Sequence, residues 1–249
     1  MGDTLLEAQG VSKTFGGVRA VDQVTLTLSP GECRALIGPN GAGKTTLFHL
    51  LTGTLPPDTG KILFRGENIT GLSPHRIWRK GLSRTFQFPE IFLHLSVLEN
   101  VQVACLSRAR QSFRLLPQAT TRWRQKGEAL LAEVGLLDQA EKTAGVLPFG
   151  DLKRLELAIA LANDPLLLLL DEPTAGLAPQ ERGALIRLIR TITEEREITV
   201  FFTEHDMDVV FALAQSILVM HQGQIVARGN PEEIRQNAEV RRIYLGSRR

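Results

Sequence analysis

The chain has 249 residues and a formal net charge of +2 at pH 7, with charged residues of both signs spread along it. This length suits one large α/β domain, or one domain with a subdomain, and it can bury a substantial core. The near balance of charge gives no case for a nucleic-acid surface, and the strongest apolar run, residues 166–170, is far shorter than the ~20 residues that cross a bilayer. We therefore expect a soluble chain without a transmembrane segment. Its two cysteines have no disulfide or metal spacing and fit a reducing compartment.

The first 64 residues alternate between strand-like runs and turns. Turn residues at 16–17 and 22–23 separate three expected strands, at 5–11, 18–21 and 24–28. The third of these alternates apolar and polar side chains, as a half-buried antiparallel strand does. Turns containing Pro and Gly precede two further strands, at 33–37 and 61–64. This pattern predicts an antiparallel β subdomain near the N-terminus.

A phosphate-binding loop (P-loop) follows the strand at 33–37. The pattern G-x-x-x-x-G-K-[ST] is met by Gly38, Pro39, Asn40, Gly41, Ala42, Gly43, Lys44, Thr45 and Thr46. Glycines let successive N–H groups turn toward one anion, and the helix predicted after the loop adds the partial positive charge of its N-terminus. We expect Lys44 to reach the β- and γ-phosphates of a nucleotide, and the Thr45 hydroxyl to ligate Mg²⁺.

Residues 88–163 have a different character. Apolar residues recur at helical spacing between residues 97 and 106, and a strongly apolar helix over 151–163 is ended by an Asp-Pro pair. We interpret this span as an α-helical subdomain inserted into an α/β core, which would comprise residues 1–87 and 164–228.

Strands and helices alternate again after residue 163. Buried strands are expected at 166–170, 198–202 and 217–220, with helices at 179–190 and 206–215. A helix starting near residue 231 begins a C-terminal helical extension over 229–249. Residues 4–246 thus predict a single α/β domain of the P-loop nucleoside triphosphatase class. It would contain a mixed sheet flanked by helices, an antiparallel β subdomain and the inserted helical subdomain.

Two carboxylates, Asp171 and Glu172, follow directly after the strand at 166–170. Ligands of an open parallel sheet bind where the strands end, so both side chains are expected near the P-loop. Asp171 would hold Mg²⁺, directly or through water, opposite Thr45. Glu172 would act as the general base that polarises the attacking water.

Over nearly its whole length the chain resembles the ATP-binding-cassette (ABC) ATPases. Gln87 follows a predicted strand, where the family's glutamine senses Mg²⁺ and the transporter contact, and His205 follows another, where the family's histidine contacts the γ-phosphate. Phe15 lies at about the spacing of the family's adenine-stacking aromatic. The position of the family's signature loop is occupied by Leu147 and by Pro148, Phe149, Gly150 and Asp151. The resemblance implies that the chain binds ATP and Mg²⁺. The metal would be held by Thr45, Gln87 and Asp171. The residues implied for catalysis are Glu172, His205, Gln87 and Lys44.

A narrower resemblance is to the ATPases of branched-chain amino acid importers and the similar urea and amide importers. It rests on short runs at 84–87, 150–151, 154–156, 175–177, 204–207 and 244–246. ATPases of lipopolysaccharide export share the Tyr-Leu-Gly ending but resemble the run at 84–87 less well.

The resemblance also implies partners. Two cassettes, identical or different, would pair head to tail, with ATP between the P-loop of one and the signature loop of the other. The pair would lie at the cytoplasmic face of the membrane beside integral membrane permease subunits, and an extracytoplasmic solute-binding protein would deliver the substrate.

Two positions depart from the family pattern: Pro148 replaces the usual signature serine, and Ala178 replaces an Asp or Asn in the loop after Glu172. Both departures affect what this chain offers its partner.

Three functions remain open at this point. The first is an importer ATPase for branched-chain or related amino acids. The second is the ATPase of a lipopolysaccharide-type exporter. The third is a regulatory subunit that closes on ATP but hydrolyses it slowly. The proline at position 148 favours this function, and the presence of Glu172 argues against it.

Overall fold

The computed structural model describes residues 4–108 and 117–246. Those parts of the predicted ranges that cover residues 1–3, 109–116 and 247–249 lie outside the described residues.

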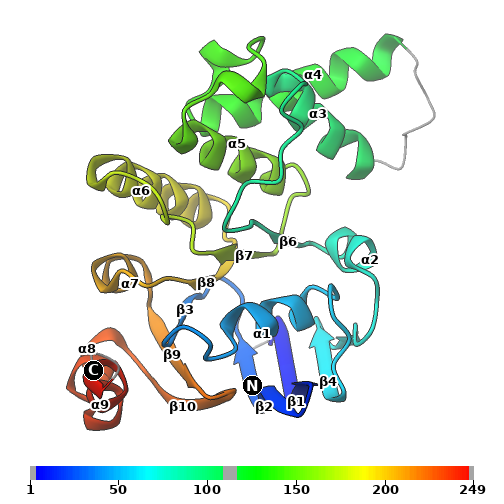
Figure 1. The fold of residues 1–249 in the computed structure, drawn as a ribbon. Coiled ribbons are helices and arrows are strands. Elements are labelled where there is room, and N and C mark those ends of the chain that lie inside the picture. Colours follow the sequence, from blue (N-terminus) through cyan, green and yellow to red (C-terminus); the bar gives the residue numbers. More distant parts are fainter. Residues whose placement is uncertain (1–3, 109–116, 247–249) are drawn as a thin grey trace.

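A six-stranded mixed sheet forms the centre of the fold (Figure 1). Its strand order is β10-β9-β3-β8-β7-β6, in which β9 and β10 are antiparallel and all other neighbours are parallel. The strands are β3 (Cys33–Ile37), β6 (Leu82–Arg84), β7 (Leu167–Asp171), β8 (Thr199–Thr203), β9 (Ser216–His221) and β10 (Gln224–Gly229). Because β3, β8 and β7 are parallel neighbours, the segments that follow them meet at one edge of the sheet.

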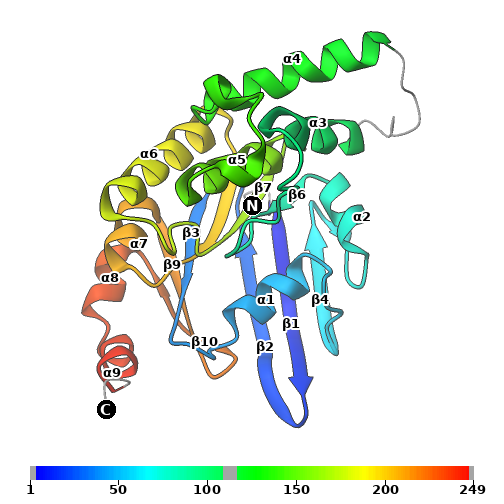
Figure 2. The same cartoon turned by 45° about the horizontal axis from the view of Figure 1, so that its top comes forward.

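An antiparallel sheet of order β2-β1-β4-β5 lies beside this centre (Figure 2). Its strands are β1 (Leu6–Phe15), β2 (Val18–Leu28), β4 (Thr59–Phe64) and β5 (Glu67–Asn68). The predicted break at 22–23 is wrong, because β2 runs through it as one strand. Gln23 adopts a left-handed conformation with φ 50° and its N–H donates to Ser12 Oγ at 2.9 Å, so the strand accommodates the polar pair as an irregularity in register rather than a turn.

Nine α-helices surround the sheets in the described ranges. They are α1 (Lys44–Leu51), α2 (Pro74–Arg79), α3 (Val97–Arg108), α4 (Pro117–Glu133), α5 (Phe149–Leu161), α6 (Pro179–Glu195), α7 (Met207–Leu213), α8 (Pro231–Gln236) and α9 (Ala238–Gly246). Helices α3, α4 and α5 lie together beyond β6 and β7 (Figures 1 and 2). None of the helices in the described part of the chain combines the length and the apolar character that a membrane span requires.

The mixed sheet is buried on both faces, which explains the continuous leucines of β7. Leu168 and Leu170 belong to the apolar cluster that includes residues of α3–α7, whereas Leu167 and Leu169 belong to the cluster that includes α1 and the antiparallel sheet. The last residue of this strand, Asp171, is charged and still only 5% exposed. A buried sheet thus places charged side chains at its edge in fixed positions.

Candidate functional site

The P-loop joins β3 to α1 and packs tightly against neighbouring backbone. A Cβ added to Gly43 would lie 2.1 Å from the carbonyl oxygen of Ala20, and Gly43 has φ 105°, so only glycine fits there. Residues 40–46 line a hollow of about 210 Å³ together with Ala20, Glu172 and His205. The first turn of α1 has no acidic residue. Its free N–H groups therefore favour an anion in this hollow.

Lys44 is folded back onto its own loop. Its Nζ donates to the carbonyl oxygens of Gly38 at 2.7 Å and Pro39 at 3.2 Å, and the residue is only 7% exposed. Burial lowers the pKa of Lys44, while the nearby charges of Glu172 and Asp171 act to raise it. An incoming phosphate offers this ammonium a charged acceptor in place of two neutral carbonyls.

Glu172 contacts two of the three other residues predicted for catalysis, His205 and Gln87. His205 Nε2 lies 2.7 Å from Glu172 Oε1, and Gln87 Nε2 donates to Glu172 Oε2 at 2.9 Å. The residue has φ 47°, and its N–H donates to the carbonyl and hydroxyl oxygens of Thr203, each at 3.1 Å. The carboxylate of Glu172 is therefore oriented by two segments of the chain, at Gln87 and at His205, while Thr203 holds its main chain at the edge of the P-loop hollow.

Asp171 is held by an ion pair that the sequence did not indicate. Arg84 Nη2 lies 2.7 Å from Asp171 Oδ2, and both side chains are at least nine-tenths buried. The other oxygen of Asp171 accepts from the Thr203 hydroxyl at 2.7 Å. The guanidinium carbon of Arg84 lies 4.9 Å from the centre of the Phe86 ring. The sequence signal that could have indicated this ion pair is a charged residue, Arg84, shortly before Gln87. Arg84 ends β6 and Asp171 ends β7, and these two strands pair directly.

The predicted magnesium ligands suit a metal held mostly by nucleotide. Thr45 is exposed at the P-loop hollow, whereas Gln87 and Asp171 lie just outside the residues that line it. The amide of Gln87 that donates to Glu172 also carries an oxygen, and Asp171 supplies a buried carboxylate whose oxygens accept from Arg84 and Thr203. All three offer oxygen, the ligand type of Mg²⁺. Across the described ranges no group of three or more His, Cys, Asp or Glu side chains could hold a metal by itself. Such a donor set fits Mg²⁺, which commonly takes one or two protein ligands and completes its shell with phosphates and water.

The remaining predicted residues lie outside the P-loop hollow. Phe15 is 45% exposed at the end of β1, with Lys13 Nζ 5.7 Å from its ring centre, so it is free to stack on a ligand, and its adenine role stays a prediction. Pro148 precedes α5, and its carbonyl accepts from the N–H groups of Asp151 and Leu152, each at 3.0 Å. Ala178 precedes α6 and has no side-chain oxygen to cap that helix. The signature residues 148–151 are absent from the lining of the P-loop hollow, so within one chain they do not meet its nucleotide site.

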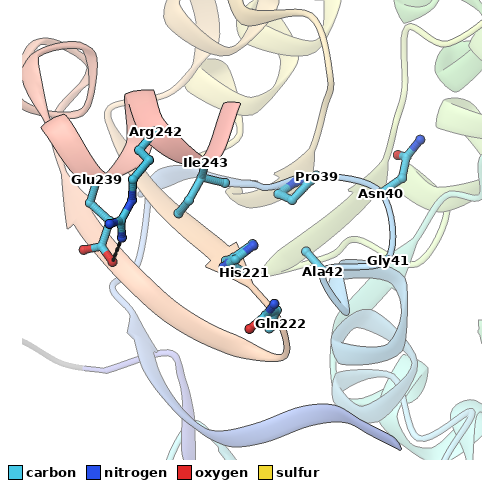
Figure 3. A pocket seen from close by; sticks show the side chains of 9 residues that line it. All are labelled: Pro39, Asn40, Gly41, Ala42, His221, Gln222, Glu239, Arg242 and Ile243. Carbon is cyan, nitrogen blue, oxygen red and sulfur yellow. Dashed lines mark ion pairs between the residues drawn. The ribbon is translucent and has the colours of Figure 1, made fainter. Parts of the chain in front are cut away.

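A second hollow, of about 520 Å³, adjoins the P-loop (Figure 3). It lies between Pro39–Ala42, the hairpin residues His221 and Gln222, and the α9 residues Glu239, Arg242 and Ile243. Residues 40–42 line both hollows. Sequence pattern alone does not indicate this second hollow, because it depends on how α9 packs beside the P-loop.

Comparison with known proteins gives consistent results. The sequence profile of the ABC transporter family matches residues 21–175, and a profile described as branched-chain amino acid ATP-binding cassette transporter matches residues 224–249. The high-affinity branched-chain amino acid transport ATP-binding protein LivG of Escherichia coli is 41% identical to this chain, in an alignment that covers 99% of each of the two proteins.

Solved structures give the same result. A crystallised ATP-binding cassette of an ABC transporter in its ADP conformation is 28% identical, with a TM-score of 0.84 over 98% of this chain and 99% of that one. The structure of cbiO1 from Clostridium perfringens, part of the ABC transporter complex cbiONQ, is 30% identical, with a TM-score of 0.82 over 98% of this chain and 95% of that one. The predicted fold class is confirmed.

Proposed function

The chain belongs to the ABC transporter family as an ATP-hydrolysing cassette, and we propose that it powers the import of branched-chain amino acids through membrane permeases. The observation that carries this proposal is identity of 41% along essentially the whole length of LivG, combined with a complete set of contacts around Glu172.

In this proposal the P-loop N–H groups and the α1 N-terminus bind the phosphates of ATP, and Lys44 exchanges its carbonyl contacts for the β- and γ-phosphates. Thr45, Asp171 and Gln87 would hold Mg²⁺, which when bound neutralises phosphate charge. Glu172 then accepts a proton from the water that attacks the γ-phosphate. His205 and Gln87 orient that carboxylate and its water from opposite oxygens.

A second cassette would complete the site. The P-loop hollow has no signature residue of its own chain, so the far side of the γ-phosphate is left for the signature loop of a partner, identical or related. The N-terminus of α5, just after Pro148, supplies N–H groups suited to that contact. We place this pair at the cytoplasmic face of the membrane, bound to permease subunits and served by an extracytoplasmic solute-binding protein, with no nucleic acid involved.

The substrate class is tested with the chain assembled with the permease subunits and binding protein of its own transport system in vesicles. We expect ATP and Mg²⁺ on the cassette side to drive accumulation of labelled leucine, isoleucine or valine. Stimulation of ATP hydrolysis by another solute class, with no accumulation of these three, would contradict the proposal.

A regulatory function is the second candidate, and Pro148 is the observation that favours it. Proline offers neither a hydroxyl nor an N–H to a partner's γ-phosphate. Pro148→Ser should therefore strengthen ATP-driven pairing by about 10- to 100-fold, since a hydrogen bond to a charged group is worth ~1.5–3 kcal/mol. Pro148→Ala is the matched control, because it removes the ring without adding a hydroxyl. Sedimentation at a series of ATP concentrations measures the effect.

Equal pairing by the Ser and Ala variants would show that position 148 makes no such contact with the nucleotide.

A further inference from the structure

Two charged side chains of α5 are buried against the segment that carries Gln87. Lys153 is 4% exposed and Glu156 is 5% exposed, and they lie three residues apart on one face of the helix. Neither is part of the catalytic set described above. Buried charges of this kind need specific partners, because removing a charge from water is costly.

The partners are main-chain groups of Phe86 and Gln87. Lys153 Nζ donates to the carbonyl oxygen of Phe86 at 3.0 Å and to that of Gln87 at 2.7 Å. Glu156 Oε1 accepts from the Phe86 N–H at 2.7 Å. Three main-chain polar groups of this irregular segment, the Phe86 N–H and the Phe86 and Gln87 carbonyls, are thus satisfied by one helix instead of by a strand partner.

Burial is the main influence on both ionisable groups. It raises the pKa of Glu156 to about 7, against the effect of the Phe86 N–H and of Lys153, and Glu90 adds a further upward effect. It also lowers the pKa of Lys153, against the charges of Glu156, Asp171, Glu204 and Glu172. The fold retains two buried ionisable side chains here, because apolar replacements would leave the main-chain groups of Phe86 and Gln87 without these partners.

The same helix also touches the loop on the other side of Glu172. A Cβ on Gly176 would lie 3.1 Å from the ring of Phe149, and a Cβ on Gly150 would lie 3.0 Å from Glu181 Oε1. The first turns of α5 therefore pack on the loop after Glu172, while its middle binds the main chain at Gln87. Gln87 in turn donates to Glu172 at 2.9 Å.

We propose that Lys153 and Glu156 are positioning residues that fasten the main chain of Phe86 and Gln87 to α5, so that the orientation of the signature helix sets the orientation of the Glu172 carboxylate. Movement of α5, for example when a partner's nucleotide meets its N-terminus, then reaches the general base through Gln87. This inference rests on the proposed function of Glu172 and Gln87 and extends it to a control of that site.

The test compares Lys153→Met and Glu156→Leu with the control Lys126→Met in the full-length protein. Lys126 forms an ion pair with Asp164 at 2.7 Å and does not contact Gln87. Lys153→Arg and Glu156→Gln keep a donor and an acceptor, respectively, and serve as conservative variants that guard against misfolding. Steady-state ATP hydrolysis and amide hydrogen exchange of residues 86–88 are measured for each.

We expect Lys153→Met and Glu156→Leu to lower kcat about tenfold or more, with the KM for ATP within about twofold because the P-loop is unchanged. Exchange at residues 86–88 should accelerate about tenfold while exchange in α1 stays the same. The conservative variants should recover to within about threefold of the original kcat.

The proposal is overturned if kcat and exchange at 86–88 match the Lys126→Met control, or if kcat falls only in proportion to the folded fraction. A wild-type protein without ATP hydrolysis would defeat the proposed function instead, and the exchange measurement would still decide whether α5 fastens this segment.

Discussion

Glu172→Gln is expected to lower the rate of ATP hydrolysis by about 10²–10⁴-fold, the usual contribution of a general base. Gln keeps the size of the side chain and one oxygen for His205 or Gln87, which contact the two Glu172 oxygens at 2.7 and 2.9 Å, but it cannot accept a proton from water. Binding of ATP should remain, since the P-loop is untouched. Phosphate release at saturating ATP and Mg²⁺ measures the loss, and an ATP-bound pair of cassettes should accumulate.

Glu195→Gln is the matched control, because Glu195 is exposed at the end of α6 and is not among the residues that line the P-loop hollow. It should leave hydrolysis unchanged. A Glu172→Gln protein that hydrolyses ATP within tenfold of the original would remove Glu172 as the base. Negligible hydrolysis by the unsubstituted chain, when assembled with its partners, would favour the regulatory function.

Lys44→Met is expected to weaken binding of ATP by about 100-fold. Lys44 Nζ has Gly38 and Pro39 carbonyls as its present acceptors, so the side chain already lies over the loop that receives the phosphates. Methionine keeps a linear side chain but loses the charge, and hydrogen bonds to charged groups are worth ~1.5–3 kcal/mol each. The combined free energy of two such bonds, to the β- and γ-phosphates, exceeds the ~2.7 kcal/mol that corresponds to roughly 100-fold in affinity. Titration with a fluorescent ATP analogue measures the loss.

Lys61→Met provides the comparison for this second variant, since Lys61 is an exposed residue of β4. Its affinity for the analogue should equal that of the unsubstituted protein. An unchanged affinity in Lys44→Met would place the phosphates elsewhere than the P-loop.

The local sequence pattern was sufficient to predict those parts of the site that lie at the ends of strands. The P-loop, Asp171 and His205 follow or close β3, β7 and β8, which are parallel neighbours in the sheet, so their convergence followed from topology. Glu172 and His205 could be placed together for the same reason. Their meeting is a property of the fold, and substitution of Glu172 tests the chemical role of its carboxylate.

Contacts between distant segments could not be predicted in the same way. The Arg84–Asp171 ion pair depends on β6 pairing with β7, and the Lys153 and Glu156 contacts depend on how α5 packs on an irregular segment. The sequence shows charged residues on a mostly apolar helix, but it does not show which buried partner satisfies them. Gln23 is a related case, because its left-handed conformation keeps β2 continuous where a polar pair predicted a turn.

The most direct test of the account is the structure of the Glu172→Gln protein with ATP and Mg²⁺. We expect ATP phosphates on the N–H groups of residues 40–46, Lys44 moved from Gly38 to the phosphates, and Mg²⁺ at Thr45 with Asp171. We also expect the signature loop of a second cassette to face the γ-phosphate. A nucleotide bound elsewhere, or one enclosed by a single chain with its P-loop contacts unchanged, would contradict it.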